Sequence, residues 1–185
     1  MSRRLSLPRV LRIGTIVCAV AVPARAQSSL EYNVKAALLL NFTRFIEWPD
    51  RAFAGASTPI EICVFAPNPF AETLPRTLEG ETVSNRTLSA RDVRTAADSA
   101  GCHLLFVPEG AEARAAALLR GSGPYAVTVG ESRRFEQLGG AVRLGVEDGR
   151  VRFSVNLRPV EDRGIRISAR MLKLAASVTR ATPEK

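Results

Sequence analysis

Hydrophobic residues recur with a helical period between residues 29 and 47. At about 100° per residue, one broad apolar face collects the following side chains: Val34, Leu38, Phe42, Phe45 and Ile46. Ser28 followed by Glu31 is a capping box, which predicts the start of this helix. Trp48 and Pro49 predict its end, because a residue before proline avoids helical backbone angles.

Two polar residues interrupt the predicted apolar face. Lys35 projects between Phe42 and Ile46, and Asn41 lies on the same side. One interpretation is structural: the Lys35 stem covers apolar neighbours while its amine reaches water, and Asn41 bonds to backbone, since an unpaired buried amide costs about 1–3 kcal/mol. The other interpretation is functional, a fixed polar contact for a ligand or partner. Leu40 falls on the opposite, polar face, so Leu40→Glu is expected to weaken partner or self-association while folding survives, and Asn41→Ala is expected to reduce stability.

Strands and helices alternate along the rest of the chain. Segments with the length and composition of strands are residues 60–66, 86–91, 102–108 and 125–130. Segments with helical composition are residues 68–78, 109–120 and one or two turns from residue 132. Several of the strands are apolar on both faces, which is typical of a sheet with helices packed on each side. The pattern predicts an α/β layered domain.

A β-hairpin is predicted at Asp148-Gly149, a preferred two-residue turn between alternating flanks. One face of the hairpin is apolar: Val142, Leu144, Val146, Val151, Phe153, Val155 and Leu157. The opposite face carries a basic patch: Arg143, Arg150, Arg152 and Arg158. The hairpin makes the predicted sheet mixed, and Ser168 is placed to cap a terminal helix over residues 169–180.

The first 26 residues have the composition of a secretory signal peptide. Arginines precede a short apolar run, and the small residues Ala24 to Ala26 form a cleavage site. The segment carries five of the 26 basic residues and none of the 18 acidic ones, so its removal lowers the formal net charge from +8 to +3. The sequence therefore predicts an exported, periplasmic protein whose residues 27–185 form a single domain, with no transmembrane segment in the mature chain.

Chemistry-bearing residues are few. Cys63 and Cys102 remain after the signal peptide, and an oxidising compartment favours a disulfide between them, although two buried thiols are the alternative. His103 is the only histidine, and its place at the start of an apolar strand favours a structural role. The spacing of these residues does not predict a metal site. We expect no catalytic residues, no metal and no cofactor.

The basic patch on the hairpin allows three interpretations. Aromatic stacking residues are missing from that face, which disfavours nucleic-acid binding. Acidic Glu147 and Asp148 lie among the arginines, so a solvated strand face is the simplest explanation. In an exported protein the patch is alternatively a site for an anionic ligand, an acidic partner or lipid headgroups.

Several separate motifs resemble the YfiR family. The opening stretch "EYNVKAALLLNFTRFIEWP" is similar to the signature of that family, and later pieces follow in the same order: "IEICVFAPNPF", "NRTLSARDV", "GCHLLFVP", "YAVTVGES", "FEQLGGAVRLGVEDGRVRFSVNL" and "GIRISARMLKLA". The motif residues that become interaction candidates are Lys35, Leu40, Asn41, Phe42, Trp48 and Pro49. The resemblance covers nearly all of the mature chain.

The resemblance implies a fold and a function. It implies a periplasmic α/β protein without catalysis that represses a membrane diguanylate cyclase by binding its periplasmic sensor region, which lowers cyclic-di-GMP signalling and biofilm formation. A homodimer is a further expectation. Cys63 and Cys102 match a family disulfide, whereas a second family cysteine pair has no counterpart here. The alternative function is a small-ligand-binding module that serves a histidine kinase or transporter, with Lys35 and the basic patch contacting an anionic ligand.

Overall fold

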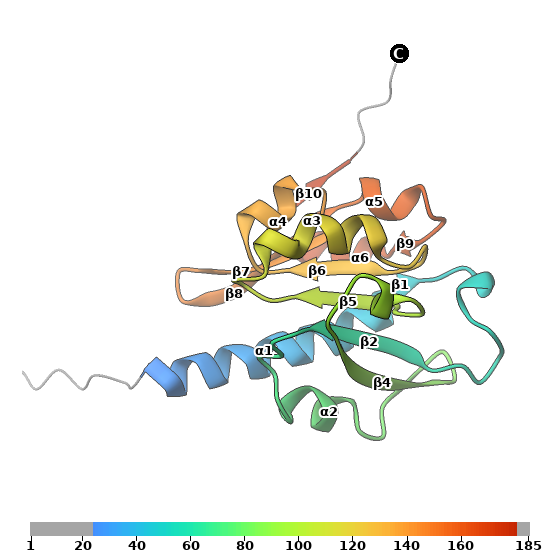
Figure 1. Ribbon diagram of the computed structural model, residues 1–185, viewed down its shortest axis with the longest axis horizontal. Helices are drawn as coiled ribbons and strands as arrows, with labels where there is room; N and C mark the ends of the chain where they lie inside the picture. The colour runs from blue at the N-terminus through green and yellow to red at the C-terminus, as the bar shows by residue number, and fades with distance from the viewer. Residues whose placement is uncertain (1–23, 181–185) are drawn as a thin grey trace, which may run out of the picture.

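The computed structural model describes residues 24–180 (Figure 1). The helices are α1 (Ala24–Phe45), α2 (Thr73–Leu78), α3 (Glu112–Gly121), α4 (Arg133–Gln137), α5 (Arg158–Glu161) and α6 (Ala169–Leu174), with 3-10 turns η1 (Asp50–Ala52) and η2 (Ala97–Ser99). The strands are β1 (Ile46–Glu47), β2 (Ile60–Phe65), β3 (Thr82–Val83), β4 (Arg86–Val93), β5 (Leu104–Val107), β6 (Val127–Gly130), β7 (Val142–Glu147), β8 (Arg150–Asn156), β9 (Arg166–Ile167) and β10 (Ser177–Thr179). The predicted signal peptide lies largely outside the described residues and stays a prediction.

An eight-stranded sheet forms the centre of the fold. Its strand order is β10-β8-β7-β6-β5-β2-β4-β3. Strands β4, β2, β5, β6 and β7 run parallel, while β8 is antiparallel to β7 and β3 is antiparallel to β4. The structure therefore confirms the predicted α/β class and the mixed sheet flanked by helices.

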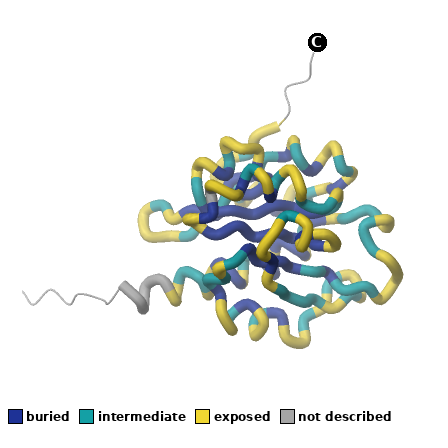
Figure 2. Tube along the Cα trace, in the orientation of Figure 1, coloured by how far each residue is buried: buried dark blue, intermediate teal, exposed yellow. Residues whose placement is uncertain are grey.

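Each face of the sheet is covered by its own apolar cluster. The larger cluster joins α1, α2 and α6 to one face through residues such as Phe42, Phe106 and Met171. The smaller one joins α3 and α4 to the other face through Leu118 and Phe135. Because both faces are covered, the central strands are buried along their length (Figure 2), as their double-sided apolar composition predicted.

The boundaries of α1 differ from the prediction. The helix begins at Ala24, so Ser28 and Glu31 lie inside it and do not form its first turn. It ends at Phe45, and the next two residues form β1, which pairs with β9. The helix before Leu78 is also shorter than predicted, because the Asn68 side chain accepts a hydrogen bond from Phe70 N and makes a separate turn.

The buried side of α1 was predicted correctly for Phe42 and Ile46 and wrongly for three other residues. Leu40 is buried in the core with 8% exposure, Asn41 is exposed, and Val34 is 42% exposed. Helix α1 packs on the sheet between α2 and α6, so a wide arc that includes Leu40 is enclosed and Asn41 faces out. The expectation that Leu40→Glu affects association but not folding is therefore overturned, as is the expected stabilising role of Asn41.

The β7–β8 hairpin forms as predicted, with positive φ at Asp148 (50°) and Gly149 (70°). Its two faces are less distinct than predicted. Near its base Ser154, which alternates with Arg152, is buried beside α4, and Val146, expected on the apolar face, is 51% exposed at the tip. The hairpin therefore has a core end with both faces covered and a free end.

The predicted terminal helix is too long. Ser168 caps α6 by accepting from Met171 N, as expected, but the helix ends at Leu174, which is 71% exposed. Residues 177–179 instead form β10, a strand parallel to β8. Hydrogen bonds to β8 satisfy the backbone of this segment, and the β-branched residues Val178 and Thr179 favour a strand.

Candidate functional site

Lys35 lies in a buried charge network at the carboxyl end of β6. Its Nζ donates to Glu31 one helical turn earlier and to Glu131, which directly follows β6. The Lys35 and Glu131 side chains are only 3% and 4% exposed. The amine therefore does not reach water, contrary to the structural interpretation of the sequence, and it is held by two carboxylates of the chain itself.

Glu131 also holds neighbouring segments. Its Oε2 accepts from Tyr32 Oη at 3.3 Å and from Glu109 N, which follows β5. Burial, followed by the negative charge of Glu131, raises the pKa of Tyr32 well above its usual range. The Lys35 amine lies 4.7 Å from the Tyr32 ring centroid, a cation–π distance. One carboxylate thus ties α1 to the ends of two central strands.

The location of this network is one where α/β proteins commonly bind ligands, outside the carboxyl ends of parallel strands. A hollow of about 420 Å³ lies beside it, lined by Glu31, Lys35, Glu109 and part of β7. However, both oxygens of Glu131 and the Lys35 amine already have partners within the chain. The network acts as an internal anchor, because these charged groups bond to one another and to neighbouring segments of the chain.

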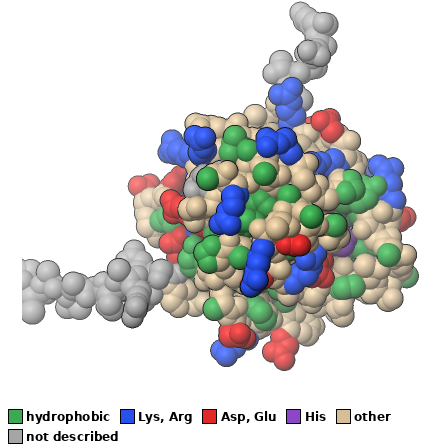
Figure 3. All heavy atoms as spheres, in the orientation of Figure 1, with side chains coloured by type: hydrophobic (Ala, Val, Ile, Leu, Met, Phe, Trp, Pro, Cys, Tyr) green, Lys and Arg blue, Asp and Glu red, His purple; other side chains and the backbone are tan. Residues whose placement is uncertain are grey.

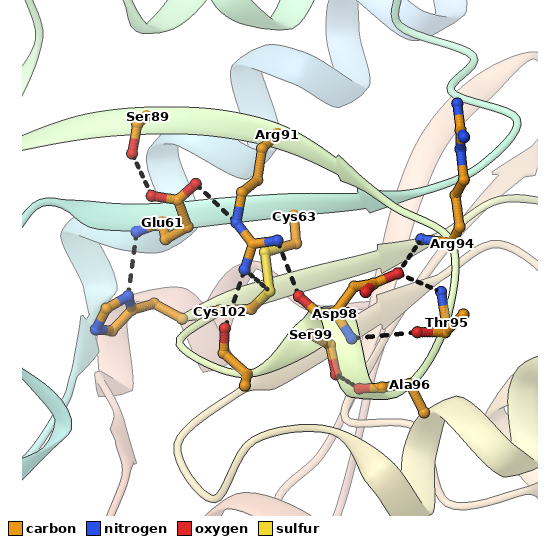
Figure 4. The surroundings of a disulfide bond; sticks show 12 residues. Glu61, Cys63, Ser89, Arg91, Arg94, Thr95, Ala96, Asp98, Ser99 and Cys102 are labelled. Atoms are coloured by element: carbon orange, nitrogen blue, oxygen red, sulfur yellow. Dashed lines mark hydrogen bonds and ion pairs between the residues drawn. A yellow bond between two sulfur atoms is a disulfide. The ribbon is translucent and has the colours of Figure 1, made fainter.

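The disulfide joins Cys63 in β2 to Cys102 just before β5, with 5.8 Å between the Cα atoms. Both residues are buried. Arg91 from β4 covers the bridge: it donates to the Asp98 and Ala100 carbonyls at 2.8 and 3.0 Å and pairs with Glu61 at 3.2 Å (Figure 4). The bridge fixes the loop before β5 to the centre of the sheet and agrees with an oxidising compartment.

His103 has the structural role that the sequence predicted. Its Nδ1 accepts from Glu61 N at 3.1 Å, so its Nε2 carries the proton and donates to the Ala52 carbonyl at 3.2 Å. The ring stacks on Phe53 with centroids 4.4 Å apart. Burial lowers the pKa of His103. The neutral side chain, with both ring nitrogens hydrogen-bonded, connects η1 to the amino end of β2.

The remaining motif residues do not gather in one site. Phe42 packs in the core with its ring centroid 5.1 Å from that of Phe153. Trp48 donates from Nε1 to the Tyr125 carbonyl at 3.0 Å, and Pro49 precedes η1. Lys35 lies near the middle of α1. The motif residues therefore hold α1 and the turn after it against the sheet.

The predicted basic patch is divided. Arg143 is largely covered and pairs with Glu136 at 2.9 Å and Glu147 at 3.1 Å. Arg150 and Arg152 are exposed on the hairpin, whereas Arg158 begins α5 instead of lying on the ribbon. On the face shown in Figure 3, Lys and Arg side chains are likewise scattered among other residues. No continuous surface of all four arginines results.

Among residues 24–180, no group of His, Cys, Asp and Glu side chains could hold a metal ion. In the same part of the chain, no helix has the length and apolar character required to cross a membrane.

Sequence reasoning missed the Lys35–Glu131 pair, because 96 positions separate the two residues. The spacing of Glu31 and Lys35 is a helical i,i+4 pair, which could have indicated half of the network. The position of Glu131 after an apolar strand gave a second, weaker signal.

Comparison with known proteins gives a family match and two related folds. A model described as YfiR/HmsC-like matches residues 32–176. A comparison with curated proteins finds no match. A conserved domain protein from Vibrio cholerae superposes with a TM-score of 0.54 at 11% identity, over 80% of this chain and 60% of that one. An ABC domain from Streptococcus pneumoniae, solved in complex with L-Trp, gives 0.51 at 10% identity, over 77% of this chain and 60% of that one.

At these identities the two solved structures show a shared fold and nothing about ligands. The chain spans about 60% of the length of each.

Proposed function

The chain belongs to the YfiR/HmsC-like family, and from this premise we propose that it binds and represses the periplasmic sensor region of a membrane diguanylate cyclase. Family membership supports a periplasmic regulatory role in general. Repression of a cyclase is the specific form of that role that we propose, and it lowers cyclic-di-GMP signalling and biofilm formation. The observation that carries the proposal is the family match over residues 32–176.

The described site supports a binding role more than a chemical one. The Lys35 network and His103 have internal partners, and the disulfide is buried under Arg91. Such features hold surface segments in fixed positions. A surface that is already ordered loses little conformational entropy when a partner binds.

Repression follows from preferential binding. If the cyclase exchanges between inactive and active conformations, a protein that binds the inactive one more tightly shifts the population toward it. Moving a receptor from 1% to 99% inactive requires a preference of about 10⁴-fold. The proposed regulator therefore needs an interface that distinguishes the two receptor conformations, and it needs no catalysis.

A deletion strain tests this proposal. Removing the gene should raise cyclic-di-GMP, and restoring the full chain should lower it again. A chain without residues 1–26, which stays in the cytoplasm, is the matched control and should not restore repression. Unchanged cyclic-di-GMP after deletion, together with no membrane cyclase recovered on the tagged protein, would contradict the proposal.

The alternative, a small-ligand-binding module, has lost one of the two observations that supported it. It relied on Lys35 as a cation for an anionic ligand, and that amine is paired with Glu31 and Glu131. The other supporting observation was the basic patch of four arginines, which is divided between the hairpin and α5. Calorimetry with nucleotides, amino acids and carboxylates tests the alternative directly.

A further inference from the structure

The outer edge of β4 is open for most of its length. Strand β4 pairs with β2 over residues 88–93, but β3 pairs with it only at Arg86 and Thr87. Within residues 24–180, no other strand covers the outer edge from Leu88 onward. In Figure 1 this strand lies beside α2 at the lower margin of the sheet. The sheet therefore ends in a strand whose outer backbone groups have no strand partner.

The direction of those backbone groups follows from the pairing. Ala66 N donates to the Val93 carbonyl, which places the hydrogen-bonding groups of Val93 on the β2 side. Because these groups alternate from residue to residue along a strand, those of Leu88, Ala90 and Asp92 point away from β2. Three consecutive outward positions can form a ladder with an added strand.

A groove runs along this edge. It has a volume of about 540 Å³ and lies between β4 and α2. Leu88 and Ala90 are half-buried and supply apolar surface on one side, while exposed Pro75 contributes on the other. A free strand edge beside a helix is the geometry in which proteins accept an extended peptide as an additional strand.

The groove carries an excess of acidic side chains. Glu72 and Glu79 flank α2, are exposed, and make no ion pair within the described residues. Glu81 is already paired with Arg44 at 2.6 Å, and Arg76 is the only basic residue along the lining. The surface is therefore complementary to an extended segment with basic side chains.

We propose that β4 accepts an extended segment of the partner protein as an added strand, and that the side chains of this segment on the α2 side of the sheet are partly apolar and partly basic. Its backbone pairs with Leu88, Ala90 and Asp92, its apolar side chains contact the groove, and its basic side chains face Glu72 and Glu79. Because successive side chains of a strand point to opposite faces, the apolar and basic residues that enter the groove are every second residue of the segment. The identity of the partner as a membrane signalling protein rests on the proposed function.

A second copy of the chain fits this edge less well. Antiparallel edge-to-edge pairing of two β4 strands, about a two-fold axis perpendicular to the sheet, places both α2 helices on one face of the joined sheet. Glu72 and Glu79 of one chain then approach their counterparts, and like charges repel. The acidic flanks therefore favour a basic partner over self-association.

Binding of a model peptide tests the inference without knowledge of the natural partner. A short fluorescein-labelled peptide whose every second residue is in turn valine or lysine, with threonine between them, is titrated with the mature chain, and its anisotropy is followed. We expect saturable binding. Ala90→Pro removes one outward N–H without touching the β2 ladder and should weaken binding by about tenfold or more. Glu72→Lys and Glu79→Lys should each weaken it by roughly threefold.

Two controls separate strand addition from general attraction. Glu161→Lys reverses an exposed acid on α5, away from the groove, and should leave the affinity unchanged. In the wild-type chain, the peptide should slow hydrogen exchange at the amides of Leu88, Ala90 and Asp92, which tests the inference even if Ala90→Pro does not fold. No binding, or binding with equal affinity for Glu79→Lys and Glu161→Lys and no protection at β4, overturns the inference.

Measurements in cells distinguish failure of this inference from failure of the proposed function. If the wild-type chain lowers cyclic-di-GMP and Glu72→Lys/Glu79→Lys lowers it equally, with no β4 protection by the peptide, then the edge inference fails and the function stands. If the wild-type chain leaves cyclic-di-GMP unchanged while the peptide protects β4, the cyclase proposal fails and the edge is a docking site for another protein.

Discussion

The polar groups at the carboxyl end of β6 are paired within the described residues, whereas many of those along the outer edge of β4 are not. At β6, Lys35 and Glu131 are nearly excluded from solvent and neutralise each other. Along β4 from Leu88 onward, the outward backbone has no strand partner among the described residues, and Glu72 and Glu79 are exposed without ion pairs. Charges that the fold has already paired stabilise it, whereas groups that the fold leaves open are available to a partner. This difference separates the anchoring part of the molecule from the part that we propose to dock.

Removing the buried cation should have the largest effect on stability. Lys35→Ala leaves Glu131 buried without its main counter-charge and should lower the free energy of unfolding by about 3–5 kcal/mol. Arg44→Ala breaks an ion pair on the same helix whose side chains are 44% and 39% exposed, so it should cost no more than about 1 kcal/mol. Urea unfolding of both variants checks this. Equal losses would show that the network is not an anchor.

Removing the disulfide should have the next largest effect. The double variant Cys63→Ser/Cys102→Ser releases a link across 39 positions and should lower the free energy of unfolding by about 2–4 kcal/mol. Unfolding is measured for the oxidised wild type, the reduced wild type and the variant. The reduced wild type and the variant should have similar free energies of unfolding. A variant as stable as the oxidised protein would contradict the role of the bridge as a structural link.

Substitutions of the neighbouring α1 residues Leu40 and Asn41 should differ sharply in their effect on stability. Leu40→Ala creates a cavity beside the sheet and should lower the free energy of unfolding by about 2–3 kcal/mol. Asn41→Ala alters an exposed side chain and should change it by less than about 0.5 kcal/mol. Thermal melts of the two variants are sufficient to rank them. The reverse order would restore the helix orientation expected from the sequence.

Acid should weaken the fold through His103. Burial lowers the folded-state pKa of this residue below its ordinary value, so the unfolded chain binds a proton more readily. The contribution is fully present above about pH 6.5, the unfolded pKa, and is lost as pH falls toward the folded pKa. His103→Gln should remove this component from the pH dependence of the unfolding free energy. Identical profiles for wild type and variant would contradict the assignment of a buried neutral imidazole.

Changes at the β4 edge should have the smallest effect on stability. Glu72→Lys/Glu79→Lys should change the free energy of unfolding by less than about 0.5 kcal/mol, because both side chains are exposed and unpaired. The same variant should lose repression of cyclic-di-GMP. Retained repression with unchanged stability would contradict a docking role for the edge.

Local features were predictable wherever neighbouring residues decide the structure. The Asp148-Gly149 turn, the apolar strands and the Ser168 cap follow from backbone preferences and short-range patterns. The disulfide was favoured by the export signal and by the family resemblance. These features need no knowledge of what packs against them.

Features that depend on distant segments were not predictable. The spacing of apolar residues predicted the α1 helix, but the burial of Leu40 depends on where α2 and α6 lie against that helix. Strand β10 forms because β8 offers an edge to residues 177–179. The partner of Lys35 and the open edge of β4 likewise depend on strand order, which no local pattern specifies.

The most direct test of the central claim is the concentration of cyclic-di-GMP in a strain that lacks the gene and carries a plasmid copy. The account predicts that the wild-type chain lowers this concentration, and that Glu72→Lys/Glu79→Lys, exported to the same level, does not. A wild-type chain that leaves cyclic-di-GMP unchanged would contradict the account of the protein as a repressor of a membrane cyclase.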